Sequence, residues 1–165
     1  MIFAGIDPGK HGAIAWMDGD RRNIQIQDCP LDGEDFDRGA VLYLLQHELQ
    51  SNTVVTMEKV HSMPHDGRVS AFAFGRAYEM WIMGLAAVGL RPQLVCPQTW
   101  KRTMLAGVAN NPAMEGKILI QRFQDRNIAS LLYGPRGGLR DGRVDAMWLA
   151  EYGRVHWKLA GRKAA

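Results

Sequence analysis

The chain opens with three short segments separated by turn-forming residues, and this pattern constrains its fold more than any other feature. Residues 2–6 are apolar and end at the turn Asp7-Pro8-Gly9, residues 13–17 are again apolar, and residues 23–27 alternate polar and apolar side chains. Short apolar runs and a period of two are typical of β-strands. We therefore expect three consecutive strands joined as hairpins.

Helices and strands alternate in the rest of the chain. Apolar periodicity predicts helices at residues 35–50, 70–90, 98–105, 114–127 and 141–159, and short apolar runs predict strands at residues 53–57 and 93–96. Ser70 is expected to cap the second of these helices. The 165 residues contain no linker or repeat. We therefore expect one α/β domain over residues 1–165, with a mixed sheet of about five strands flanked by helices on both faces.

The charges are unevenly distributed. Residues 1–99 carry 8 Lys/Arg and 12 Asp/Glu, whereas residues 100–165 carry 12 Lys/Arg and 5 Asp/Glu. A basic C-terminal third suits a polyanionic partner, although an ordinary solvated surface would have the same composition. No apolar run suits a membrane span, the N-terminus is unlike a targeting peptide, and Cys29 and Cys96 are too few for a disulfide framework. We expect a cytoplasmic protein without a membrane partner.

Four carboxylates stand at the ends of expected elements. Asp7 ends the first strand, Glu58 ends the fourth strand, and Asp141 and Asp145 begin the last helix. If the first and fourth strands are neighbours, Asp7 and Glu58 emerge side by side, while Asp141 and Asp145 share one helix face. Clustered carboxylates repel one another, and Mg²⁺ would relieve that repulsion. Two such ions could activate water and stabilise the leaving oxygen in a displacement at phosphorus.

Each acid also has an ordinary structural interpretation. An aspartate before Pro-Gly is usually a turn former, and a glutamate at a strand end is usually solvated. Asp141 could be a helix N-cap, and Asp145 could be a first-turn acid favoured by the helix dipole. The residues alone leave both interpretations open.

Five segments resemble the RuvC-type Holliday-junction resolvases of the RNase H-like superfamily. In chain order they are G-I-D-P-G-K-H-G-A at residues 5–13, M-E-K-V at residues 57–60, residues 70–75, C-P-Q-T-W-K at residues 96–101, and D-G-R-V-D-A at residues 141–146. The resemblance spans nearly the whole chain and implies an RNase H-like fold. It further implies a homodimeric endonuclease that resolves four-way (Holliday) DNA junctions by paired symmetric nicks, leaving 5′-phosphate and 3′-hydroxyl ends.

The same resemblance assigns roles to individual residues. Asp7, Glu58, Asp141 and Asp145 are implied to be the catalytic acids that bind two Mg²⁺ ions, for which Mn²⁺ would substitute. Lys101 matches the family's catalytic basic residue near the scissile phosphate, and Lys117 matches it more loosely. The last two acids are four residues apart, which is more like the phage and organellar branch than the bacterial enzymes, where they tend to be three apart.

Further residues are expected to contact branched DNA. Bacterial members carry an aromatic wedge three residues after the second acid, where this chain has His61, followed by Met63 and His65. Phe72 and Phe74 could stack on bases, although aromatics on an apolar helix more often belong to the core. The candidate phosphate contacts, which position DNA without reading its sequence, are Lys10, Arg68, Arg76, Lys101, Arg102, Lys117, Arg140 and Arg143.

The expected helix at residues 70–90 is apolar nearly all round, which predicts burial on more than one side. The core of one domain could provide that burial, but we favour a homodimer seam. Three other functions compete with junction cleavage. They are a nuclease acting on RNA–DNA hybrids, forks or flaps, a catalytically silent junction-binding protein, and an actin-like ATPase, for which the chain is too short and lacks a second Gly-rich motif.

Overall fold

A five-stranded mixed sheet forms the centre of the computed structural model, which describes residues 1–59, 67–108, 111–134 and 137–163. The sheet order is β3-β2-β1-β6-β7. β1 pairs antiparallel with β2, which pairs antiparallel with β3, so the expected hairpins are confirmed. β1 also pairs parallel with β6, so the first and fourth expected strands are neighbours. The strands are β1 (Ile2–Asp7), β2 (Ala13–Asp18), β3 (Gln25–Asp28), β6 (Val54–Glu58) and β7 (Gln93–Val95).

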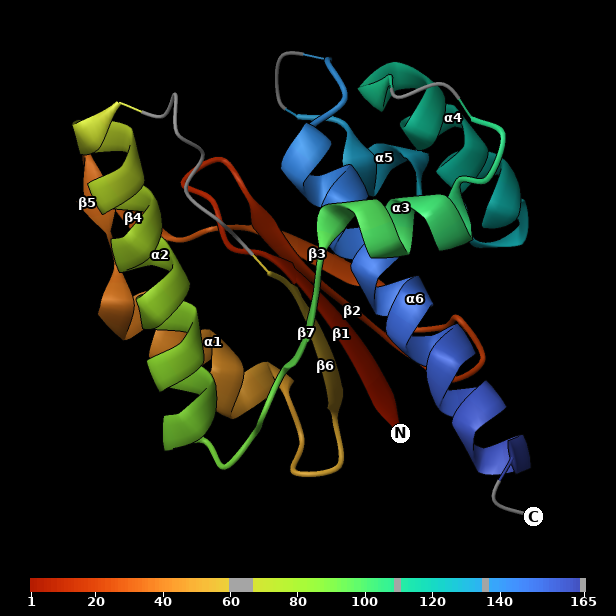
Figure 1. Ribbon diagram of the computed structural model, residues 1–165, viewed down its shortest axis with the longest axis horizontal. Helices are drawn as coiled ribbons and strands as arrows, with labels where there is room; N and C mark the ends of the chain where they lie inside the picture. The colour runs from red at the N-terminus through yellow and green to blue at the C-terminus, as the bar shows by residue number, and fades with distance from the viewer. Residues whose placement is uncertain (60–66, 109–110, 135–136, 164–165) are drawn as a thin grey trace.

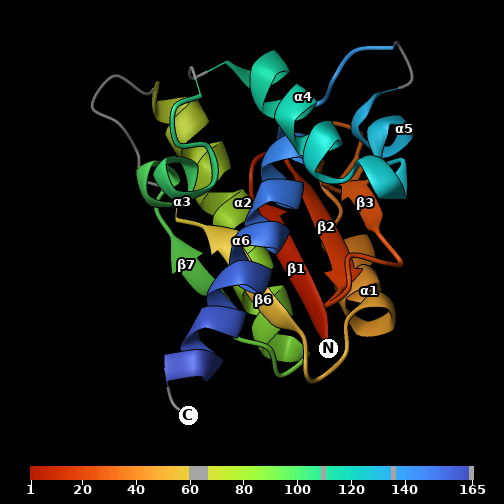
Figure 2. The ribbon, with the colours of Figure 1, turned by 90° about the vertical axis from the view of Figure 1, so that its right-hand side faces the viewer.

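Helices cover both faces of this sheet, as expected (Figure 1). α1 (Arg38–Glu48) and α2 (Arg68–Ala87) pack on one face. α6 crosses the other face over β1, with three shorter helices around its first half (Figure 2). The three shorter helices are α3 (Pro97–Met104), α4 (Pro112–Arg122) and α5 (Ala129–Leu132), and α6 comprises Asp141–Lys163. No helix in the described ranges combines the length and apolarity needed to cross a membrane.

Two glycines allow α6 to approach the sheet closely. A Cβ atom on Gly5 of β1 would lie 2.1 Å from the carbonyl oxygen of Ala146 in α6. A Cβ atom on Gly142 would lie 2.3 Å from the carbonyl oxygen of His11, in the turn between β1 and β2. Real Cβ atoms do not tolerate such distances to backbone, so only glycine fits at these positions. The close approach brings the start of α6 against the end of β1.

Two expected helix starts are wrong. The first two residues of the helix expected at residues 35–50 instead form β5 (Asp35–Phe36), which pairs with β4 (Leu31–Asp32). α1 starts at Arg38, because the side chain of Asp37 caps the helix by accepting a hydrogen bond from Ala40 N–H. α2 starts at Arg68 with Gly67 before it, so Ser70 lies inside the helix and is not its cap.

The region expected to be one helix over residues 114–127 is divided. α4 ends at Arg122 and is followed by a 3-10 helix, η1 (Gln124–Arg126), and by the short α5, neither of which was predicted. Asn127 between them has a left-handed backbone with φ of 49°, which an α-helix cannot continue through.

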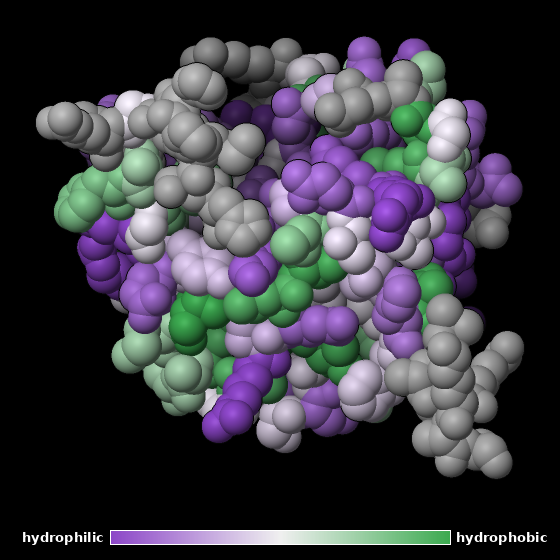
Figure 3. Space-filling model, in the orientation of Figure 1, coloured by the Kyte–Doolittle hydropathy of each residue, from purple (hydrophilic) through white to green (hydrophobic). Residues whose placement is uncertain are grey.

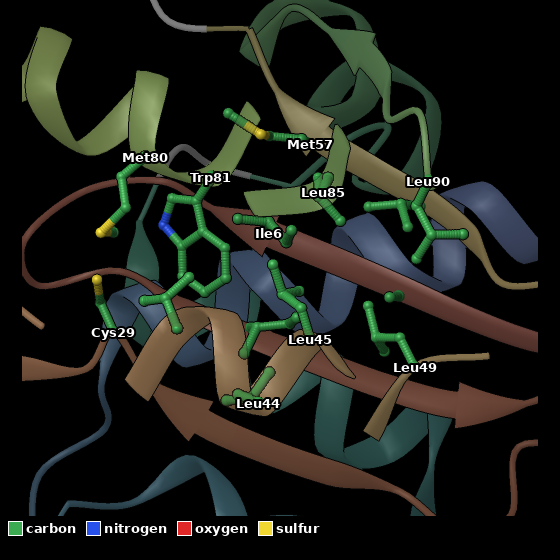
Figure 4. Close-up of a cluster of buried hydrophobic side chains, with 14 of the residues drawn as sticks. Ile6, Cys29, Leu44, Leu45, Leu49, Met57, Met80, Trp81, Leu85 and Leu90 are labelled. Atoms are coloured by element: carbon green, nitrogen blue, oxygen red, sulfur yellow. The ribbon is translucent and has the colours of Figure 1, made fainter. Parts of the chain in front are cut away.

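α2 has one exposed and one buried side. Phe72 and Met83 are 69% and 59% exposed, and Phe74 is also exposed, so the interpretation of these phenylalanines as core residues is wrong. Figure 3 shows hydrophobic surface on the α2 side of the molecule. The opposite side of α2 buries Trp81 and Leu85 among side chains of α1 and the sheet (Figure 4). A single copy of the chain therefore buries only one side of this helix.

Candidate active site

Asp7 and Glu58 lie at the same edge of the sheet. β1 and β6 are parallel with Ile6 opposite Met57, so the next residue of each strand is one of these acids. The backbone N–H of Gly9 donates to Asp7 Oδ1 at 3.3 Å, and Trp100 Nε1 of α3 donates to Glu58 Oε2 at 3.1 Å. The strand register thus brings the two carboxylates together, and neighbouring groups orient each of them.

Asp145 joins this pair from α6. Burial raises the pKa of Asp145 to about 7; Lys101 opposes this rise, and the charges of Asp7 and Glu58 add to it. Burial, followed by the charge of Glu58, likewise raises the pKa of Asp7 to about 6. Burial also raises the pKa of Glu58. Glu58 therefore disfavours the charged form of Asp7, and both of these acids disfavour the charged form of Asp145.

Asp141 occupies a neighbouring position. It is the first residue of α6 and lines a cavity of about 530 Å³ together with Asp7, Lys10, Phe74 and Arg140. Asp7 thus borders both the acid cluster and this cavity. Within the described ranges, no three His, Cys, Asp or Glu side chains are placed so that they could hold a metal ion. The structure gathers Asp7, Glu58 and Asp145, and sets Asp141 beside them.

Lys101 lies between Asp145 and a glutamate that the sequence analysis missed. Its Nζ is 3.8 Å from Asp145 Oδ1 and 3.1 Å from Glu115 Oε2. Burial works against the charge of Lys101, but Asp145, Glu115 and Glu58 outweigh it and raise the lysine pKa. Glu115 lies in α4 and is only 2% exposed. The sequence signal was an acid four residues before the buried Leu119, on the apolar side of its helix.

Besides Lys101, four of the expected DNA contacts form ion pairs within the chain. Lys10 Nζ lies 2.7 Å from Glu34 Oε2, and Arg76 Nη2 lies 2.6 Å from Asp35 Oδ2. Arg143 binds both carboxylate oxygens of Asp28, at 2.6 and 2.9 Å, and also donates to the carbonyl oxygens of Leu131 and Tyr133. Arg140 lies 3.5 Å from Asp28. Arg143 therefore joins the start of α6 to β3, to α5 and to the residue that follows α5.

The other expected contacts differ in their surroundings. Arg102 and Lys117 are exposed and form no ion pair with another residue that the structure describes. Phe74 is 40% exposed beside Asp141 in the cavity. Arg68 begins α2, but its side chain lies outside what is described, and so do the whole of His61, Met63 and His65.

Comparison with known proteins finds similarity in structure alone. No family model and no curated protein sequence matches the chain. The structure of Thermus thermophilus RuvC in complex with a Holliday junction substrate is similar, with a TM-score of 0.62 and 15% identity over 97% of this chain and 96% of that one. A second structure of Thermus thermophilus RuvC gives a TM-score of 0.59 and 16% identity over 98% and 97%. The expected RNase H-like fold of the RuvC type is thereby confirmed.

Proposed function

We propose that this protein is a metal-dependent endonuclease that resolves four-way DNA junctions. The observation that carries the proposal is the convergence of Asp7, Glu58 and Asp145 from β1, β6 and α6 at one edge of the sheet, beside Lys101. The fold supports it, because the chain aligns over nearly its full length with a RuvC whose structure contains a Holliday junction.

Carboxylate oxygens are the type of ligand that a hard divalent cation prefers. All three acids carry a raised pKa because they are buried together, so a cation among them would restore their charged forms. We infer that these acids, with Asp141, hold two Mg²⁺ ions and that Mn²⁺ substitutes. When bound, such ions activate a water for attack at phosphorus and stabilise the leaving oxygen.

The chain itself orients the acids and balances charge. The Gly9 N–H and the Trp100 indole fix one oxygen each of Asp7 and Glu58. Lys101 lies close enough to Asp145 to neutralise charge that develops on a phosphate bound there. We expect 5′-phosphate and 3′-hydroxyl products. The four-residue spacing of Asp141 and Asp145 favours a place near the phage and organellar branch.

The DNA is proposed to lie across the cavity that borders Asp7. Lys10 and Arg140 line this cavity together with the exposed Phe74, which offers an aromatic face to an unpaired base. Arg102 and Lys117 are exposed on α3 and α4 and are suited to phosphate contacts. Their charges position the DNA, while the branched shape of the substrate selects it.

The functional unit is proposed to be a homodimer that pairs through α2. Phe72 and Met83 are exposed and are eleven residues apart, which is three helical turns, so they lie on the same face. A four-way junction has two-fold symmetry, and two sites related by a dimer axis would make paired, symmetric nicks.

The test is a cleavage assay with purified protein in Mg²⁺ and in Mn²⁺. An immobile four-way junction is compared with a linear duplex, a flap and an RNA–DNA hybrid, for the wild type, Asp7→Asn and the exposed control Asp32→Asn. The proposal requires symmetric, ligatable nicks in the junction by the wild type and the control, and binding without cleavage by Asp7→Asn. Cleavage of the hybrid or flap instead would show that the substrate is wrong. If the protein binds the four-way junction tightly but cleaves no substrate, it is a junction-binding protein and not a nuclease.

A further inference from the structure

We propose that Glu115 is a positioning residue that holds the ammonium group of Lys101 beside Asp145 while keeping it out of the acid cluster. The inference rests on the proposed nuclease function for its catalytic consequence. The contact between the two side chains, which we call the tether, is inferred from geometry alone. In it, Lys101 Nζ lies 3.1 and 3.4 Å from the two carboxylate oxygens of Glu115.

The burial of Glu115 demands a cationic partner. Its side chain is 2% exposed, and a buried carboxylate is strongly unfavourable unless it is paired and hydrogen-bonded. Lys101 is the cation that forms an ion pair with Glu115 among the residues described. The pairing is therefore part of the folded structure and differs from the solvated ion pairs that occur on any protein surface.

Glu115 is itself held firmly relative to α6. The indole of Trp148 in α6 donates to the backbone carbonyl of Glu115 at 3.3 Å. Further along α4, Arg122 Nε donates to the buried Glu151 of α6 at 3.1 Å. Figures 1 and 2 show α3, α4 and the first half of α6 at the same end of the molecule. Because Asp145 also belongs to α6, the carboxylates of Glu115 and Asp145 are fixed by one helix pair.

The distances define what the tether does. Lys101 Nζ is closer to Glu115, at 3.1 Å, than to Asp145, at 3.8 Å. A lysine has a long stem with many rotamers and three donors, and it would form a closer pair with Asp145 if nothing restrained it. Such a pair would occupy carboxylate oxygens that we propose for cation binding. Glu115 thus leaves Asp145 available and keeps the positive charge near a bound phosphate.

The first test measures the tether without any activity. Purified protein is treated with acetic anhydride at a limiting concentration, and acetylation of each lysine is followed by mass spectrometry. Lys117 is exposed on the same helix as Glu115 and serves as an internal reference. We expect Lys101 to react about tenfold more slowly than Lys117 in the wild type, and Glu115→Gln to remove most of this difference. Equal rates for the two lysines in the wild type would overturn the tether, whatever the protein cleaves.

The second test measures the catalytic consequence by single-turnover cleavage of the junction. Glu115→Gln should lower the rate constant about 10- to 100-fold, which is usual for groups that orient a residue of a metal site, with junction affinity in Ca²⁺ changed less than about threefold. It should also raise the Mg²⁺ concentration that gives half-maximal rate, and Glu115→Asp should recover part of the rate. The exposed Glu48→Gln, at the end of α1, is the matched control and should cleave as the wild type does.

A double variant separates positioning from general destabilisation. If Glu115 acts through Lys101, then Glu115→Gln combined with Lys101→Ala should cleave no more slowly than Lys101→Ala alone. Additive losses, or a normal rate for a folded Glu115→Gln, would overturn the inference. If the wild type cleaves no substrate, the proposed function fails, and the acetylation experiment still decides whether Glu115 restrains Lys101.

Discussion

The charge of Asp7 should destabilise the metal-free protein at neutral pH, and Asp7→Asn should therefore stabilise it. Burial and the charge of Glu58 raise the pKa of Asp7 from 3.8 to about 6. This difference corresponds to at most about 3 kcal/mol of unfolding free energy. Asparagine carries no charge but retains an oxygen that can accept the hydrogen bond from Gly9 N–H, so the substitution removes the cost and keeps the contact.

The sign of the pH dependence follows from the raised pKa. Well below pH 3.8, Asp7 is protonated in both the folded and the unfolded states, and the variant gains nothing. Between pH 3.8 and about 6, the unfolded chain loses this proton while the folded protein keeps it, so the wild type loses stability as the pH rises. Above about pH 6 both states are charged and the full cost is present. The advantage of Asp7→Asn should therefore grow from near zero below pH 4 to a plateau above pH 6.

Urea unfolding followed by circular dichroism, in EDTA from pH 3.5 to 8, measures this difference. The exposed Asp32→Asn is the control, and a difference of about 3 kcal/mol would also raise the melting temperature by about 6–12 °C. Added Mg²⁺ should stabilise the wild type more than Asp7→Asn, because a bound ion favours the folded state. An Asp7→Asn variant no more stable than the wild type at pH 8 would show that Asp7 is not a destabilising buried charge. The electrostatic argument for a cation site would then be lost.

Three further changes probe the scaffold. Gly5→Ala should destabilise the protein by about 3 kcal/mol in urea unfolding, because the added Cβ would meet the backbone of α6, and a variant as stable as the wild type would contradict that contact. Arg143→Ala should lower the melting temperature by at least about 2 °C, because it removes the ion pair with Asp28 and two hydrogen bonds to carbonyl oxygens. An unchanged melting temperature would show that these contacts do not stabilise the fold and that Arg143 is available to bind DNA. In analytical sedimentation, Met83→Lys should convert the dimer to a monomer, whereas Glu48→Lys, at the end of α1, should leave the dimer intact. If Met83→Lys still sediments as a dimer, this face of α2 is not the dimer interface.

Much of the sheet could be predicted because its signals are local. Residues 2–6 and 53–57 are apolar runs that end at acids, and parallel strands of this kind place their C-terminal residues at one edge. The sequence indicated that Asp7 and Glu58 would emerge side by side if these two strands were neighbours, and the structure shows that they are. The last helix was also predicted to start at Asp141, because the preceding Gly/Arg segment ends there.

Long-range pairs could not be predicted in this way. Nothing near Glu115 in the sequence indicates Lys101, which lies 14 residues earlier, and nothing near Arg143 indicates Asp28, which lies 115 residues earlier. The sequence suggested DNA contacts for Arg143 because a lone basic residue looks solvated until its partner is known. The break after Arg122 was missed for a related reason, since Asn127 gives only a weak signal for a left-handed backbone.

The same contacts that assemble the proposed site also make it electrostatically unfavourable without cations. Gly5 and Gly142 bring α6 against β1 and the turn that follows it. This approach removes water from Asp7 and Asp145, and burial is the largest cause of the raised pKa of each. A looser helix would lower the repulsion but would also separate the acids. The fold therefore holds mutually repelling carboxylates at one edge of the sheet, and a divalent cation bound there would make the net electrostatic interaction favourable.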